Sequence, residues 1–299
     1  YQLHKTTDTP FNEKVIEPQN FIVVNHHIVN PSKYKIGYMR IGAATNTRSM
    51  YSTILDDLPC SDSVPVFYNK NYTLNDLIPV VIIFNSFSFD FALRKRLGGA
   101  QINYFILEES PLPPPDIFPS ALNLLGYRLC LTHLKFGYSW LEIARILPEI
   151  RGTHWKSLWA ITPHERLRLR CILDAVVAEL YGISYEDFEW ILKDDPTDPK
   201  GFWRIDKNKP KELRHTTLAL EAFKHLKEVG LDKFIEEDWQ FRPEIQEQLG
   251  PRFYDWQLEG TPEESWAECE FHAKQFLGEE NYKKFIENLE KTKFPDSTK

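Results

Sequence analysis

The hydrophobic positions divide this chain into two parts of different character. In the first part, short apolar runs bounded by turn residues predict strands, at residues 21–24, 34–41 and 64–68. After a proline-rich segment, apolar residues instead recur every three or four positions, which predicts helices over residues 121–134, 140–147, 165–182 and 213–229. We therefore expect an α+β fold in which a mainly helical region follows a β-containing one.

Residues 80–115 join the two parts and carry the strongest pattern. The apolar run Val80–Phe84 fits either a buried strand or the start of a buried helix. Phenylalanines continue at helical spacing beyond it, so we predict one long helix over residues 82–97. The pair Gly98-Gly99 ends this helix, because glycine adopts positive φ without steric cost.

A further strand is predicted directly after this helix, from Ile102 to Leu107. The prolines at 111–115 stop it, because a proline nitrogen cannot donate to a sheet ladder. The helix itself ends on three cations, Arg94, Lys95 and Arg96. Cations there suit the negative end of the helix dipole, and they also suit a phosphate backbone, so the position alone leaves both explanations open.

Length and composition limit the classes of protein. A chain of 299 residues holds one large domain or two ordinary ones, and it has no apolar run long enough to span a membrane. Four scattered cysteines without CxxC spacing argue against a zinc ribbon or a disulfide framework and fit the reducing cytoplasm. The chain begins at Tyr1 without a signal-peptide core, and we expect it to be part of a longer protein.

The net charge of −7 is unevenly distributed. Residues 1–180 contain 18 Lys and Arg against 16 Asp and Glu, whereas residues 181–299 contain 18 against 27. An acidic balance weakens non-specific binding to nucleic acid, but it does not exclude a local basic surface. The first part is therefore the one able to contact phosphates. The acidic second part favours an alternative, in which the chain docks on a partner protein.

Two polar segments are candidates for a nucleic-acid surface. The run Thr45, Asn46, Thr47 and Arg48 has the donors and acceptors that base edges and phosphates need. The same run also fits an ordinary β-turn with a solvated arginine. Lys156 lies in a basic segment with two tryptophans, which either grips nucleic acid by charge and stacking or simply precedes a helix.

The clearest helix signals surround residues 162–187. Thr162 followed by proline and Glu165 is typical of a capped helix start. Gly182 ends that helix, and Ser184 caps a second one with Asp187 at its third position. These residues predict a helical hairpin.

Three segments together resemble the C-terminal part of large adenine-specific DNA methyltransferases of the type IIG restriction-modification group. The first runs from Arg40 to Ser49 and is similar to the family pattern R-x-I…T-N-x-R-(T/S), although Asp56 and Asp57 follow where the family has apolar residues. The second combines Asn85-Ser86, the three cations and Asn103–Pro115. The third is R-x-x-L-D-A-x-x-A-x-L-Y-G within residues 170–182.

The resemblance implies a target recognition domain over residues 21–115, after a connector at residues 1–20 and before a helical C-terminal region at residues 116–299. It also implies sequence-specific binding of double-stranded DNA beside an upstream methyltransferase domain, in restriction-modification or phage defence. The DNA-contacting residues that we predict are Arg40, Thr45, Asn46, Thr47, Arg48, Arg94, Lys95, Arg96, Asn103 and Lys156.

The chemistry of methyl transfer is missing from these 299 residues. An adenine methyltransferase needs a glycine-rich loop for S-adenosylmethionine and an (N/D)PP(Y/F) loop for the flipped base. Leu112–Pro115 is the nearest string, and it lacks both the Asn or Asp and the aromatic residue. We therefore expect no cofactor, metal or catalysis here. The S-adenosylmethionine belongs to the parent protein, and whether that protein also cleaves DNA stays open.

Overall fold

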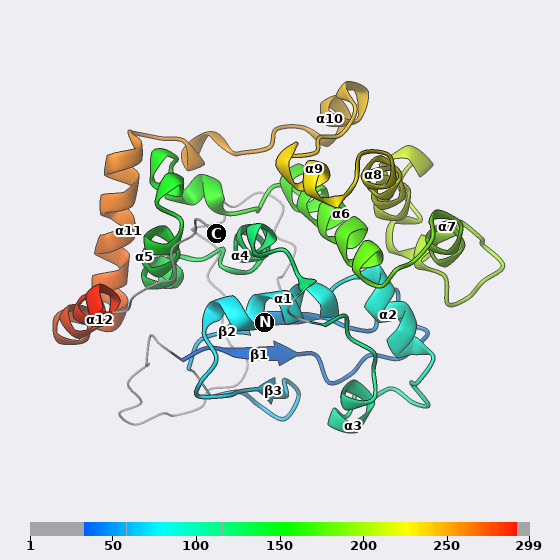
Figure 1. The fold of residues 1–299 in the computed structure, drawn as a ribbon, viewed down its shortest axis with the longest axis horizontal. Helices are drawn as coiled ribbons and strands as arrows, with labels where there is room; N and C mark the ends of the chain where they lie inside the picture. Colours follow the sequence, from blue (N-terminus) through cyan, green and yellow to red (C-terminus); the bar gives the residue numbers. More distant parts are fainter. Residues whose placement is uncertain (1–32, 58, 115–116, 292–299) are drawn as a thin grey trace.

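A small antiparallel sheet and a large set of helices form the fold (Figure 1). The computed structural model describes residues 33–57, 59–114 and 117–291. The strands are β1 (Lys35–Tyr38), β2 (Ser52–Leu55) and β3 (Val66–Phe67), in the order β2-β1-β3. The predicted strands at 34–41 and 64–68 are confirmed in shorter form. The predicted strand at 21–24 lies outside the described residues.

The α-helices follow the sheet along the chain. They are α1 (Leu74–Phe84), α2 (Phe87–Arg94), α3 (Tyr104–Glu108), α4 (Asn123–Cys130), α5 (Gly137–Ile146), α6 (Pro163–Leu180), α7 (Tyr185–Leu192), α8 (His215–Val229), α9 (Leu231–Glu236), α10 (Pro243–Leu249), α11 (Pro262–Leu277) and α12 (Glu279–Lys291). Short 3₁₀ helices connect them: η3 (Ser120–Leu122), η4 (Leu134–Phe136), η5 (Pro148–Gly152), η6 (Trp155–Leu158), η7 (Phe202–Asp206), η8 (Lys211–Leu213) and η9 (Asp255–Gln257).

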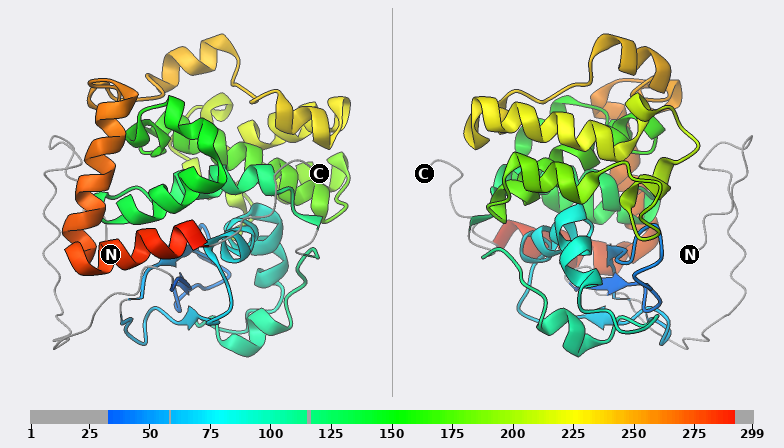
Figure 2. Two further views of the ribbon diagram at one scale, coloured as in Figure 1. Left: turned by 60° about the vertical axis from the view of Figure 1, so that its left-hand side comes forward. Right: turned by 90° about the vertical axis from the view of Figure 1, so that its right-hand side faces the viewer.

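Most of the helices lie on one side of the sheet (Figures 1 and 2). In Figures 1 and 2 the sheet and α3 stay at the lower end of the molecule, and the helices from α4 onward stack above them. Helix α1 packs on β2 and on α4, and α6 packs along α8. Helix α11 stands at the opposite edge from α2 and α3 in Figure 1, where it packs on α5. The fold is therefore α+β with a mainly helical C-terminal region, as predicted.

The predicted long helix over residues 82–97 is wrong, because two helices meet there at an angle of 64°. The side chain of Asn85 donates to the carbonyl of Ser52 at 2.9 Å and accepts from its backbone N–H at 3.1 Å. Ser86 then caps α2 by accepting from the backbone N–H of Phe89 at 3.1 Å. Asn85 thus fixes the end of α1 to β2, and Ser86 starts α2 because its side chain satisfies a backbone N–H of the new helix.

The predicted strand at 102–107 is also wrong, because α3 occupies it. Ile102 still pairs with the first part of the chain through its backbone, but helical bonds begin after Asn103. Tyr104 and Phe105 are exposed, whereas Ile106 and Leu107 are buried. Two exposed residues followed by two buried ones is a helical pattern, and a strand would alternate them singly.

The helical hairpin is confirmed. Thr162 Oγ1 accepts from the backbone N–H of Glu165 at 3.1 Å, and Gly182 has a φ of +66° after the end of α6. Ser184 Oγ accepts from the backbone N–H of Asp187 at 3.0 Å and so caps α7. The hairpin braces the first part of the chain, because the backbone N–H of Phe87 donates to Asp174 of α6 at 2.8 Å.

Within the described residues, no single helix is both long and apolar enough to cross a membrane. The bent pair α1 and α2 reaches the required length and composition only when its two helices are taken together, and most of α1 is buried in the core.

Candidate nucleic-acid interface

Two segments that carry predicted contact residues lie side by side. The backbone N–H of Gly42 donates to the carbonyl of Ala100 at 2.9 Å, and that of Ile102 donates to the carbonyl of Arg40 at 2.7 Å. An isolated β-bridge joins Ile41 to its partner in the second segment, Gln101. This pairing brings Arg40 next to Asn103, although more than sixty positions separate them in sequence.

The polar turn at Thr45–Thr47 adjoins the C-terminal end of α2. Its three side chains are exposed. Arg94 fixes the turn, because its guanidinium donates to the carbonyls of Asn46 at 3.1 Å and Thr47 at 2.9 Å. The next two cations, Lys95 and Arg96, are exposed at the same end of α2.

We call this surface the recognition edge. It consists of seven predicted contact residues that reach solvent: Arg40, Thr45, Asn46, Thr47, Lys95, Arg96 and Asn103.

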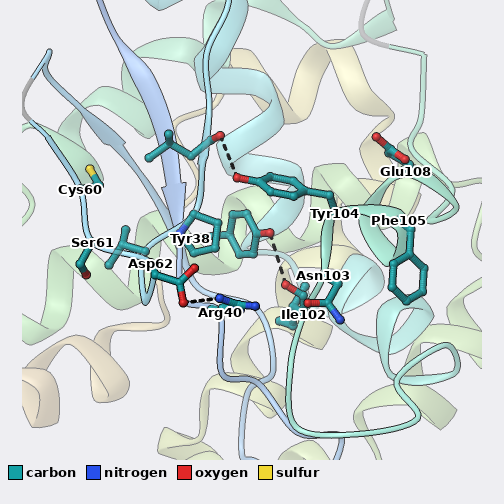
Figure 3. Close-up of a pocket in the computed structure, with 13 residues that line it drawn as sticks. Tyr38, Arg40, Cys60, Ser61, Asp62, Ile102, Asn103, Tyr104, Phe105 and Glu108 are labelled. Carbon is teal, nitrogen blue, oxygen red and sulfur yellow. Dashed lines mark hydrogen bonds and ion pairs between the residues drawn. The ribbon is translucent and has the colours of Figure 1, made fainter.

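A hollow of about 670 Å³ opens beside Arg40 and Asn103. Figure 3 shows Arg40 paired with Asp62 and lying near Asn103, while Phe105 and Glu108 extend from α3. Tyr38 and Tyr104 lie between these groups, with ring centroids 6.2 Å apart and an edge-to-face arrangement. The remaining lining residues are Cys60, Ser61, Val64, Pro65, Val66 and Ile102. The hollow therefore combines exposed aromatic rings with an amide and charged groups.

The rings of the hollow are held in place by hydrogen bonds to the backbone. Tyr38 donates to the carbonyl of Ile102 at 3.3 Å, and Tyr104 donates to that of Val66 at 3.4 Å. Burial raises the pKa of Tyr38 to about 12, so its hydroxyl stays protonated at neutral pH. Tyr104 nevertheless keeps 46% of its surface exposed, and Phe105 keeps 57%. Two aromatic faces are thus available to a ligand.

Arg48 lies in the core and not on the recognition edge. Its side chain is 5% exposed, and its Nε lies 3.1 Å from Asp90, which is fully buried. Its guanidinium also donates to the carbonyl of Asn85 and lies 4.6 Å from the ring centroid of Phe87. Because these partners enclose it, the arginine serves the packing of the turn on α2.

Arg94 is likewise enclosed, with a side chain only 6% exposed. Its Nε donates to Asp90 at 2.6 Å, and its carbon Cζ lies 4.2 Å from the ring centroid of Phe202. Arg94 therefore positions the recognition edge without forming part of its surface.

Lys156 lies apart from the other predicted contacts. It belongs to η6, and its Nζ lies 2.6 Å from Glu268 of α11, at the opposite edge of the molecule in Figure 1. The arginines that follow it are mostly internal. Arg168, for example, has no exposed side-chain surface and pairs with the buried Glu165 at 2.9 Å. The basic segment thus holds α6 against its neighbours.

Sequence reasoning missed four residues of the hollow as candidates: Asp62, Tyr104, Phe105 and Glu108. The predicted strand would have buried every second residue from Ile102 onward, which hid the exposure of Tyr104. Asp62 carried no signal of its own, because only the fold brings it to Arg40.

Comparisons with protein-family models, with curated proteins and with solved structures find no match to this chain.

Proposed function

We propose that this chain recognises a specific sequence in double-stranded DNA, as the C-terminal part of an adenine-N6 DNA methyltransferase. The setting would be restriction-modification or a related phage-defence system. One observation carries the proposal: the pairing of residues 40–42 with residues 100–102 brings predicted contact residues of two distant segments together. A duplex needs such a continuous surface, since base contacts and phosphate contacts are made together.

The residues of the recognition edge divide into two roles. Asn103 has an amide that donates and accepts, which suits the N6 and N7 atoms of adenine, and Arg40 suits guanine once it leaves Asp62. Lys95 and Arg96 are exposed cations that neutralise phosphates and release counterions. The exposed Thr45–Thr47 turn adds further hydrogen-bonding groups to either role.

Methyl transfer belongs to the upstream domain in this proposal. That domain would bind S-adenosylmethionine and the flipped adenine, and this chain would supply the target sequence without chemistry of its own.

A second candidate function is protein docking without base contacts. Its support is a set of exposed apolar side chains, one of which, Phe105, lines the hollow, since exposed apolar surface marks interaction sites. Ile41 is 61% exposed, Phe105 is 57% exposed, Ile117 is 45% exposed and Leu112 is 41% exposed. A docking module of a defence complex would bury these side chains against a partner protein.

Duplex binding by three variants tests the proposal. Asn103→Ala should lower affinity for the cognate duplex and leave a scrambled duplex unchanged, because it removes a base contact worth roughly 1–3 kcal/mol. Lys95→Ala should weaken both duplexes equally and reduce the salt dependence by about one phosphate contact. Lys156→Ala is the matched control, because this lysine pairs with Glu268 far from the recognition edge.

Fluorescence anisotropy at two salt concentrations measures all three variants. Equal affinities of the parent, Asn103→Ala and Lys95→Ala proteins for both duplexes would contradict the proposal and favour the docking module.

A further inference from the structure

We infer that the hollow beside the recognition edge binds an unstacked nucleobase that carries an exocyclic amine. The inference rests on the proposed function and deepens it, because it names the base class and the place where that base lies. The contacts at the rim would then extend into a pocket, and the DNA would be read partly through a base that has left the stack.

The size of the hollow fits such a ligand. Sites for small molecules have volumes of roughly 300–1,000 Å³, and the hollow encloses about 670 Å³. A base with its sugar is smaller than this volume. Arg40 and Asn103, which are proposed to contact the DNA, both line the hollow (Figure 3).

The aromatic rings supply a stacking surface. Phe105 exposes more than half of its surface, and Tyr104 is fixed by its hydroxyl and by an edge contact with Phe67 at 5.6 Å. A rigid, exposed ring stacks on any base, because every base has a π face. Stacking alone therefore predicts binding without a preference between bases.

The polar groups supply the preference. Asp62 and Glu108 both line the hollow, and an ionised carboxylate only accepts hydrogen bonds. The side chain of Asn103 adds an acceptor oxygen, and it makes no capping hydrogen bond to α3. An exocyclic amine donates to such acceptors, whereas the carbonyl oxygens of thymine would face negative charge. Adenine is accordingly bound in preference to thymine.

Binding of short single strands tests this inference directly. Fluorescein-labelled hexanucleotides of deoxyadenosine and of thymidine are titrated with the protein, with Phe105→Ala and with Tyr72→Ala. We expect tighter binding of the adenine strand and a loss of about five- to 150-fold in Phe105→Ala, from the stacking energy of one base. Tyr72→Ala, an exposed ring outside the hollow, should bind as the parent does.

Two results would overturn the inference: equal binding of both strands by the parent protein, or an adenine preference that Phe105→Ala leaves intact. Far-UV circular dichroism verifies the fold of each variant, and Glu108→Gln provides a second probe, which should reduce the preference for adenine over thymine. The duplex titrations separate the two proposals. If duplexes bind through Asn103 and Lys95 while Phe105→Ala changes nothing, the pocket is wrong and the recognition edge stands.

Discussion

Replacing Asp90 by alanine removes the carboxylate that pairs with Arg48 and with Arg94, the residue that fixes the turn of the recognition edge. This carboxylate is fully buried. The Nε of Arg48 lies 3.1 Å from one of its oxygens, and the Nε of Arg94 lies 2.6 Å from the other. It also accepts from the backbone N–H groups of Ser49 at 2.9 Å and Met50 at 3.3 Å. The substitution therefore leaves two enclosed guanidinium groups and two backbone donors without their acceptor.

The cost follows from the burial of these groups. Breaking a buried ion pair by removing one partner costs about 3–5 kcal/mol, because the remaining charge stays uncompensated. The arginines are 5% and 6% exposed, so water cannot replace Asp90 without local opening. A loss of this size is a large share of the roughly 5–15 kcal/mol that stabilises a folded domain.

Urea unfolding followed by tryptophan fluorescence measures the loss. We expect a much lower midpoint for Asp90→Ala and an unchanged midpoint for Glu280→Ala, which breaks an exposed pair with Lys284 on α12. Duplex affinity should also fall in Asp90→Ala, because Arg94 would no longer hold the turn. A destabilisation below about 1 kcal/mol, the level of an exposed salt bridge, would refute the assignment of these arginines to the core.

Two further predictions concern the packing of the sheet and the helices. Burial lowers the pKa of His215 to about 4, and Arg170 adds to this effect, so acid favours the unfolded chain. His215 should leave the free energy of unfolding unchanged above about pH 6.5, and it should lower that free energy as the pH falls from there to about 4. Urea unfolding of His215→Gln over the same pH range should not show this loss. In Gly42→Ala a Cβ would meet the carbonyl oxygen of Ser49 at 2.1 Å, so both stability and duplex binding should drop. Gly98→Ala, where a Cβ meets nothing within 4 Å, should lower neither the midpoint of unfolding nor duplex affinity.

The local signals in the sequence predicted the hairpin of α6 and α7 correctly. The caps at Thr162 and Ser184 lie within a few residues of the backbone groups that they satisfy. Periodicity over many residues likewise found α6 and α8, because a helix repeats its buried positions along its own length.

The errors came from contacts between distant residues. Asn85 ends α1 because it bonds to Ser52, and no local pattern encodes that partner. The sequence predicted Arg48 as a surface contact residue, but its ion pair with the buried Asp90 places it in the core. The same limit applies to the recognition edge, because sequence reasoning named its residues and only the fold showed which of them reach solvent.

Selection from a library of random duplexes tests the central claim most directly. The protein is incubated with the library, bound duplexes are recovered and sequenced over several rounds, and Asn103→Ala is carried through in parallel. We predict that the parent protein enriches one sequence motif and that Asn103→Ala loses specificity at one position of it. Recovery of duplexes with no motif enriched over the input would contradict sequence-specific DNA recognition by this chain.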